Sequence, residues 1–133
     1  MTKFVVDAGV VIRLAREELD VSPKHLLFAP TILRSHVLSS LHEAVGRGDL
    51  SDDEGRELLE RASAIKMRLL GDLVLRRTAW KYADELGAAS TYEAEYLALT
   101  RLQGDAFVTL DRALATRAAA LVPIAPFDAL FQG

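Results

Sequence analysis

Two short runs of apolar, β-favouring residues, one near each end of the chain, limit most strongly how this sequence can fold. Residues 4–6 form the first run and residues 106–109 the second. Uninterrupted runs of this kind are typical of strands buried on both faces, as in a parallel sheet that is covered by helices. Asp7 follows the first run and Asp111 the second. Because functional groups collect at the carboxyl ends of parallel strands, both carboxylates are candidate site residues.

Segments with the helical spacing of apolar residues separate the strand candidates along the whole chain. Proline and glycine end several of these segments, and Ser51 followed by Glu54 is the signature of a capping box. We predict helices over residues 10–17, 31–47, 52–65, 73–86, 92–102 and 112–120, strands over 4–6, 26–29, 106–109 and 121–124, and a short strand or an extended connection over 66–70. This alternation predicts an α/β fold in three layers around a small parallel sheet of about four to five strands.

Composition narrows the classes of protein to which the chain can belong. Half of the 133 residues are hydrophobic, which suits a single domain over residues 1–133. Cysteine is absent, so metal ligands must come from carboxylates and histidine. The net charge of −3 gives no general attraction to nucleic acid, which would need a local basic patch or bound cations. No apolar run approaches the roughly 20 residues of a membrane span, and we expect a cytoplasmic protein.

Asp7 and Asp111 would come within reach of one divalent ion if their strands are neighbours. The alternative is that each aspartate only caps the helix that follows it. Glu93 and Glu95 lie in the first turn of a predicted helix, and since they are two residues apart only one of them can face a shared site. Their alternative function is to compensate the helix dipole. Mg²⁺ prefers such oxygen ligands, whereas Mn²⁺ also accepts a histidine nitrogen.

Four segments, taken together, resemble PIN-domain proteins and in particular the VapC toxins of bacterial toxin–antitoxin pairs. Their order and spacing match over essentially the whole chain. The segments are Val5-Val6-Asp7-Ala8, residues 29–38, Tyr92-Glu93-Ala94-Glu95-Tyr96-Leu97-Ala98-Leu99, and Val108-Thr109-Leu110-Asp111. The resemblance implies a PIN-like α/β/α ribonuclease whose clustered acids hold Mg²⁺ or Mn²⁺ for the hydrolysis of RNA. It also implies a VapB-like antitoxin as partner.

The resemblance assigns site residues position by position. Asp7 matches the first acid of the family, and Thr109 and Asp111 match its Thr-x-Asp motif. Glu93 stands where the family normally has aspartate, and His36 where it normally has glutamate. The implied metal ligands are therefore Asp7, Asp111 and Glu93. His36 is a fourth candidate, which can bind Mn²⁺ or a metal-bound water but is a poor ligand for Mg²⁺.

Basic residues near the two aspartates are candidates for contacts with RNA. Arg13 and Arg16 follow Asp7 on the first predicted helix, and Arg112 directly follows Asp111. Together they would form a basic rim around an acidic centre. By contrast, we interpret the cations of residues 76–81 as a solvated helix face.

The remaining aromatic and apolar residues bear on packing and on partners. Trp80, Tyr82 and Tyr96 have a spacing that is compatible with the core, so we do not expect them to stack on bases. The predicted helices over residues 31–47 and 52–65 carry more apolar side chains than one sheet face needs. This surplus suggests a homodimer seam or a groove for the antitoxin.

Two functional hypotheses follow, and His36 separates them. The first is an active metal-dependent endoribonuclease of the VapC kind. The second is a catalytically impaired PIN-like protein that acts by binding RNA or an antitoxin, because His36 leaves three acids where the family usually has four. A nucleotide-binding domain of the receiver type is a more distant third alternative, and the chain has no glycine-rich phosphate loop to support it.

Overall fold

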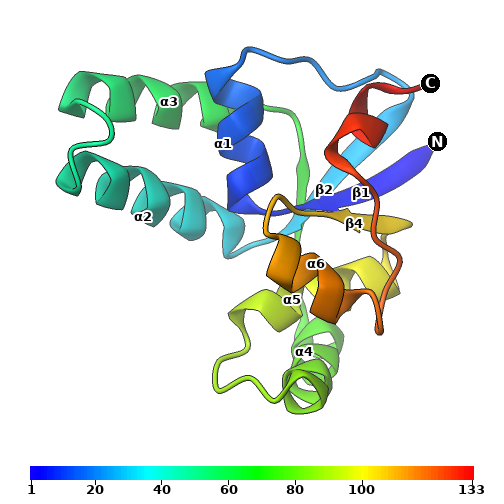
Figure 1. Ribbon diagram of the computed structural model, residues 1–133. Helices are drawn as coiled ribbons and strands as arrows, with labels where there is room; N and C mark the ends of the chain where they lie inside the picture. The colour runs from blue at the N-terminus through cyan, green and yellow to red at the C-terminus, as the bar shows by residue number, and fades with distance from the viewer.

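The computed structural model, which describes residues 1–133, has a four-stranded parallel sheet with helices on both of its faces (Figure 1). The predicted α/β fold with a small parallel sheet is confirmed. The elements follow one another in the order β1 (Thr2–Val6), α1 (Ala8–Arg16), β2 (His25–Pro30), α2 (Leu33–Gly46), α3 (Asp52–Ala64), β3 (Arg68–Leu70), α4 (Leu73–Leu86), α5 (Tyr92–Leu102), β4 (Ala106–Val108), α6 (Arg112–Ala118) and the 3₁₀-helix η1 (Phe127–Phe131).

Strand β1 lies inside the sheet, whose strand order is β3-β2-β1-β4. Val5 and Val6 have no exposed surface, as predicted for a strand that is covered on both faces. Because β1 and β4 are parallel, their carboxyl ends lie at the same edge of the sheet, where Val6 pairs with Val108. This register places the residues that follow the two strands, Asp7 and Thr109, next to each other.

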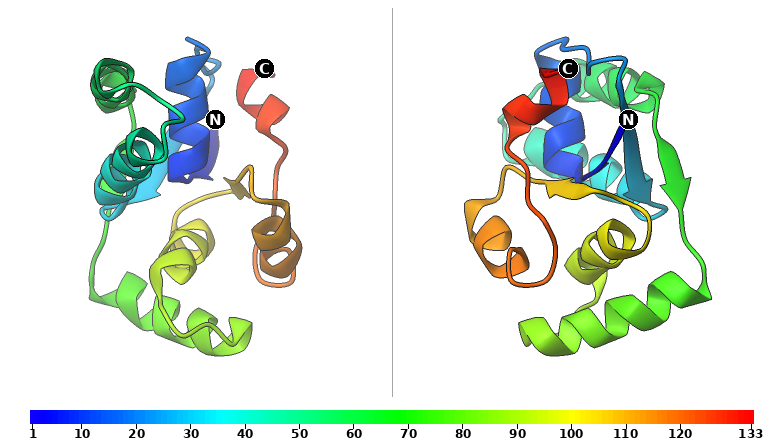
Figure 2. Two further views of the ribbon diagram at one scale, coloured as in Figure 1. Left: turned by 60° about the vertical axis from the view of Figure 1, so that its left-hand side comes forward. Right: turned by 90° about the vertical axis from the view of Figure 1, so that its right-hand side faces the viewer.

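The helices form two layers. In Figure 1 and Figure 2, α1, α2 and α3 lie on one side of the sheet, and α4, α5 and α6 lie on the other. Helix α3 begins at the predicted capping box, in which Ser51 Oγ accepts from the Glu54 N–H at 3.1 Å and Glu54 Oε1 accepts from the Ser51 N–H at 2.9 Å. None of these helices combines the length and the apolar character needed to cross a bilayer.

One cluster of 32 buried apolar side chains runs through the sheet and both helical layers. Leu130 of η1 belongs to it and has no exposed surface. The Leu130 carbonyl oxygen also accepts from the Ser22 N–H at 2.9 Å, in the connection between α1 and β2. The C-terminal segment is therefore part of the core.

The prediction of a strand over residues 121–124 is wrong. Only a single bridge forms, between Phe107 and Ile124, with the Phe107 N–H donating to the Pro123 carbonyl oxygen at 2.9 Å. Pro123 has no N–H to continue a ladder, so pairing stops there. At the start of α2 the structure also differs from prediction, because Pro30 still belongs to β2 and the helix begins at Leu33.

The prediction that Trp80 lies in the core is also wrong, whereas Tyr82 and Tyr96 are buried as predicted. Trp80 is 70% exposed. Helix α4 buries the stripe that includes Ala79, and Trp80 follows it by about 100° around the helix. An apolar surplus was predicted on α2 and α3. The structure exposes one large apolar side chain on α2, Leu38, and none on α3, whereas three are exposed on α4: Leu73, Val74 and Trp80.

The burial of Leu130 predicts that η1 stabilises the whole fold. Leu130→Ala should lower the free energy of unfolding by about 2–5 kcal/mol, because it empties a fully buried site. Urea denaturation would measure this change. The matched control is Leu102→Ala at a position that is 40% exposed, where a change of about 0.5 kcal/mol or less is expected. Equal effects of the two substitutions would contradict the structural importance of η1.

Candidate acidic site at the carboxyl edge of the sheet

Asp7 leaves the end of β1 and serves as the N-cap of α1. Its Oδ1 accepts from the Val10 N–H at 3.1 Å, which satisfies one of the free donors in the first turn of the helix. Its Oδ2 accepts from the Thr109 hydroxyl at 2.5 Å. The capping interpretation of Asp7 is therefore correct, and the same carboxylate also reaches across to the end of β4.

Thr109 connects the two aspartates. While its hydroxyl donates to Asp7, the same oxygen accepts from the Asp111 N–H at 3.2 Å. Asp111 in turn caps α6, since its Oδ1 accepts from the Leu114 N–H at 3.0 Å. Its other carboxylate oxygen has no hydrogen bond from the protein, and the residue is exposed. The structure thus brings Asp7, Thr109 and Asp111 together at one edge of the sheet.

The pKa of Asp7 is raised above its ordinary value. Burial is the largest cause, because a half-buried carboxylate loses hydration. The negative charge of Asp111 also raises this pKa, while hydrogen bonds from Thr109 and Val10 lower it. The two carboxylates are therefore close enough to repel each other, and a proton or a cation bound between them would relieve that repulsion.

His36 belongs to a neighbouring cluster on α2 and α5. Its Nδ1 is 2.8 Å from the Tyr96 hydroxyl, and the two rings stack with centroids 5.8 Å apart. The Tyr92 ring meets the His36 ring edge-on at 5.7 Å. Since Nδ1 is engaged by Tyr96, only Nε2 is left to meet a metal ion or a metal-bound water.

Glu95, rather than Glu93, is the helix acid that lies near His36. Burial raises the pKa of Glu95, and electrostatic interactions with His36 and Arg76 oppose that shift. Burial also raises the pKa of Tyr96, and the charges of Asp7 and Glu95 add to this shift. Tyr96 is therefore a neutral phenol. It contacts His36, and the charges of Asp7 and Glu95 both act on it.

Glu93 lies apart from the two aspartates. It is exposed, and its Oε2 accepts from Arg117 Nη2 at 3.2 Å, across α5 and α6. No group of three or more histidine, aspartate or glutamate side chains is arranged to hold a metal ion. The predicted set of Asp7, Asp111, Glu93 and His36 is therefore brought together only in its first two members.

The aspartate pair fits a hard divalent cation. Mg²⁺ usually keeps several waters and binds through one or two carboxylates. Asp7 and Asp111 supply such oxygens, and a cation bound to them would offset the cost of burying the Asp7 charge and the repulsion from Asp111, which both raise the pKa of Asp7.

The three predicted RNA-contact arginines differ in their surroundings. Arg13 forms an ion pair with Glu17 at 2.7 Å and lies over the Phe127 ring. Arg16 is about 14 Å along α1 from Asp7 at 1.5 Å per residue. Arg112, the first residue of α6, is exposed and forms no ion pair. Only Arg112 thus combines a free cation with a position beside the acids.

Two residues of this region, Glu95 and Tyr96, are not among the site residues predicted from the sequence. Tyr96 was correctly predicted to be buried, and Glu95 was weighed together with Glu93, since only one of the two could face a shared site. Tyr96 is 60 residues from His36 in the chain, and no local pattern reports that contact.

Comparisons with known proteins find similar structures but no match by sequence. No protein-family model and no curated protein matches the sequence. The crystal structure of PAE2754 from Pyrobaculum aerophilum matches with a TM-score of 0.76 and 21% identity, over 97% of this chain and 92% of that chain. VapBC-1 from nontypeable Haemophilus influenzae matches with a TM-score of 0.60 and 12% identity, over 94% of this chain and 98% of that chain.

Identities of this size establish the fold alone. The matches cover nearly the whole of each chain, so they concern the complete arrangement of sheet and helices and not one motif. The predicted three-layer α/β/α fold is therefore confirmed, and the chain shares this fold with PAE2754 and VapBC-1.

Proposed function

We propose that this protein is a metal-dependent endoribonuclease of the VapC kind. The observation that carries the proposal is the linked group of Asp7, Thr109 and Asp111 at the carboxyl edge of the sheet. In an open α/β sheet this edge is where catalytic groups collect. The match of the fold to VapBC-1 supports the same class of protein.

In this proposal Asp7 and Asp111 would hold Mg²⁺ or Mn²⁺ together. Such a cation, when bound, would supply polarisation of a phosphodiester and a lower pKa for an attacking water. Thr109 acts as a positioning residue, because its hydroxyl fixes one oxygen of Asp7 and receives the Asp111 N–H. Arg112 lies beside this pair as a free cation for an RNA phosphate.

Glu93 is the third proposed ligand and would move to the metal when RNA and cation bind. Its present partner is Arg117, and both side chains are 53% exposed. Exposed ion pairs of this kind contribute about 0–1 kcal/mol. Exchanging Arg117 for a metal ion is therefore inexpensive, and it would release Arg117 for contact with RNA.

A second candidate function is a PIN-like protein that binds RNA or an antitoxin without cleaving RNA. The observation in its favour concerns position 36. The residue there is histidine instead of the fourth family acid, and its Nδ1 is engaged by Tyr96. Cleavage of total cellular RNA in the presence of Mn²⁺ or Mg²⁺ separates the two functions.

The proposed partners are a VapB-like antitoxin and a second copy of the chain. The name VapBC-1 supports a protein of this fold in a toxin–antitoxin pair. For self-association, the exposed Leu73, Val74 and Trp80 place the apolar surface on α4 rather than on α3. The homodimer is therefore proposed through α4.

Asp7→Asn should abolish cleavage and raise stability in the absence of metal. A bound metal ion stabilises the transition state by several kcal/mol. Each loss of about 1.4 kcal/mol slows the reaction tenfold, so the cleavage rate should fall by at least about 100-fold. Asparagine keeps the N-cap of α1. The folded-state pKa of Asp7 is raised, so its charge destabilises the fold at pH 7, and this penalty disappears below the unfolded value near 3.8.

Thermal melting should therefore show a higher Tm for Asp7→Asn than for wild type at pH 7, and no difference below pH 3.8. Millimolar Mn²⁺ should raise the Tm of wild type and leave that of the variant unchanged. A lower Tm at pH 7 would mean that Asp7 is structural, and an unchanged cleavage rate would refute the proposed site.

Thr109→Val should weaken the site without removing a ligand. The loss of the hydroxyl raises the pKa of Asp7 further, since that hydrogen bond lowers it. Loss of such a supporting hydrogen bond typically lowers metal affinity or activity about 10–100-fold. Metal titration followed by Tm would measure affinity, and RNA cleavage would measure activity. Thr109→Ser, which keeps the hydroxyl, should restore both. Equal loss in the serine and valine variants would contradict the positioning role.

His36→Glu should increase cleavage supported by Mg²⁺, because it restores an oxygen ligand at the position of the family acid. Wild type should work better with Mn²⁺, which accepts an imidazole nitrogen. His36→Gln is the control, since it removes the ring without adding a charge. If both variants cleave like wild type with either ion, His36 is outside the site. If only His36→Glu cleaves, the natural protein is catalytically impaired.

A further inference from the structure

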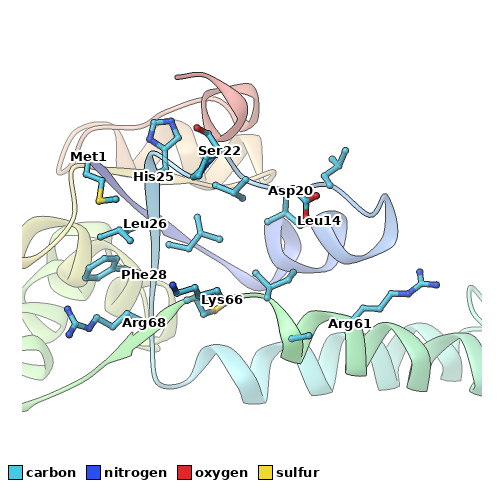
Figure 3. Close-up of a pocket in the computed structure, with 17 residues that line it drawn as sticks. Met1, Leu14, Asp20, Ser22, His25, Leu26, Phe28, Arg61, Lys66 and Arg68 are labelled. Carbon is cyan, nitrogen blue, oxygen red and sulfur yellow. The ribbon is translucent and has the colours of Figure 1, made fainter.

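We propose that a cavity at the opposite edge of the sheet binds a medium-chain carboxylate. The cavity has a volume of about 830 Å³ and lies along β2, with residues from α1, α3 and the connections around them (Figure 3). It contains none of the residues of the acidic site. The proposal is therefore independent of the ribonuclease activity.

The cavity exists because the edge of the sheet is incomplete. Strand β3 pairs with Phe28, Ala29 and Pro30 only, so the first half of β2 has no neighbour on that side. Leu26, Leu27 and Phe28 all line the cavity. Since successive strand residues point to opposite faces, a cavity that touches all three lies at the edge of the strand.

The residues that line the cavity indicate that the main part of the ligand is apolar. Ten of the seventeen lining residues are hydrophobic, which favours an apolar ligand. Leu14, Leu19 and Val21, which come from α1 and the segment after it, also line the cavity. The volume lies within the range of about 300–1,000 Å³ that is usual for small-molecule sites.

The cationic side chains in the lining indicate that one end of the ligand is anionic. Arg61, Lys66 and Arg68 line the cavity, against Asp20 as its only acid. Arg61 is already paired with Glu57 at 2.7 Å. Lys66 and Arg68 form no ion pair, and they follow each other along the segment that enters β3. An anionic head group at this end would compensate two free cations.

His25 lies at the other end of the cavity. It begins β2, three residues before Phe28, and therefore lies about 10 Å along the strand from the level of Arg68. Its Nε2 donates to the Gln132 carbonyl oxygen and its Nδ1 is shielded from solvent, so neither ring nitrogen is open to a ligand in the cavity. The end of the ligand that reaches this level is therefore expected to be apolar.

Isothermal titration calorimetry with two ten-carbon probes tests this inference on the whole protein, below the concentration at which each probe forms micelles. Decanoate should bind at least fivefold more tightly than decanol, because only the carboxylate meets the cations. Equal affinity of decanoate and decanol, or no saturable binding of any probe, would overturn the proposal.

Variants locate the site. Ala64 is exposed at the end of α3 and lines the cavity, so Ala64→Trp should abolish binding by filling it. Ser63→Trp, one residue earlier and outside the lining, should bind like wild type. Lys66→Gln with Arg68→Gln should reduce decanoate affinity at least fivefold and leave decanol unchanged.

The matched charge control is Arg34→Gln with Arg101→Gln, which removes two exposed cations far from the cavity. This control should bind decanoate like wild type. Thermal melting of every variant confirms that it is folded, and RNA cleavage by the Ala64→Trp variant should be unchanged. Loss of decanoate binding in both charge variants would mean that net charge, and not this cavity, attracts the probe.

Discussion

The parallel pairing of β1 with β4 is the constraint on which the rest of the candidate site depends. Val6 and Val108 are register partners, and the chain leaves both strands at the same edge of the sheet. Asp7 and Thr109 are the next residues on each side, and the hydrogen bond between them closes the edge. Since β1 and β4 are 100 residues apart in the chain, the fold must be complete before the two aspartates can meet.

The two aspartates combine a structural and a chemical function. Each uses one carboxylate oxygen to cap a helix, which fixes the direction of the side chain. The opposing interpretations of cap and site are therefore compatible, because capping holds the carboxylate where a cation could use it. The same arrangement buries Asp7 and places it near Asp111, and both effects raise the pKa of Asp7. The charge that could bind a cation therefore lowers the stability of the fold when no cation is bound.

Local patterns were sufficient to predict most of the helices and strands and the capping box, since each depends on neighbours within a few residues. The approach of Asp7 to Asp111 was inferred from the expected side-by-side placement of their strands, and β1 and β4 do pair. Features that depend on tertiary packing were not accessible. Which face of α4 is buried decides the exposure of Trp80, and the rotation of α5 decides whether Glu93 or Glu95 faces inward. The strand expected before Ala125 failed for a local reason, because Pro123 cannot donate to a ladder.

The exposed position of Trp80 also decides what optical experiments can report. It is the only tryptophan in the chain, and it lies on the outer face of α4, away from the buried cluster. Its indole is already largely hydrated in the native protein, so its emission is a weak indicator of global unfolding. The same indole becomes a sensitive indicator when another molecule covers α4, since burial of this single fluorophore would shift its emission to shorter wavelength.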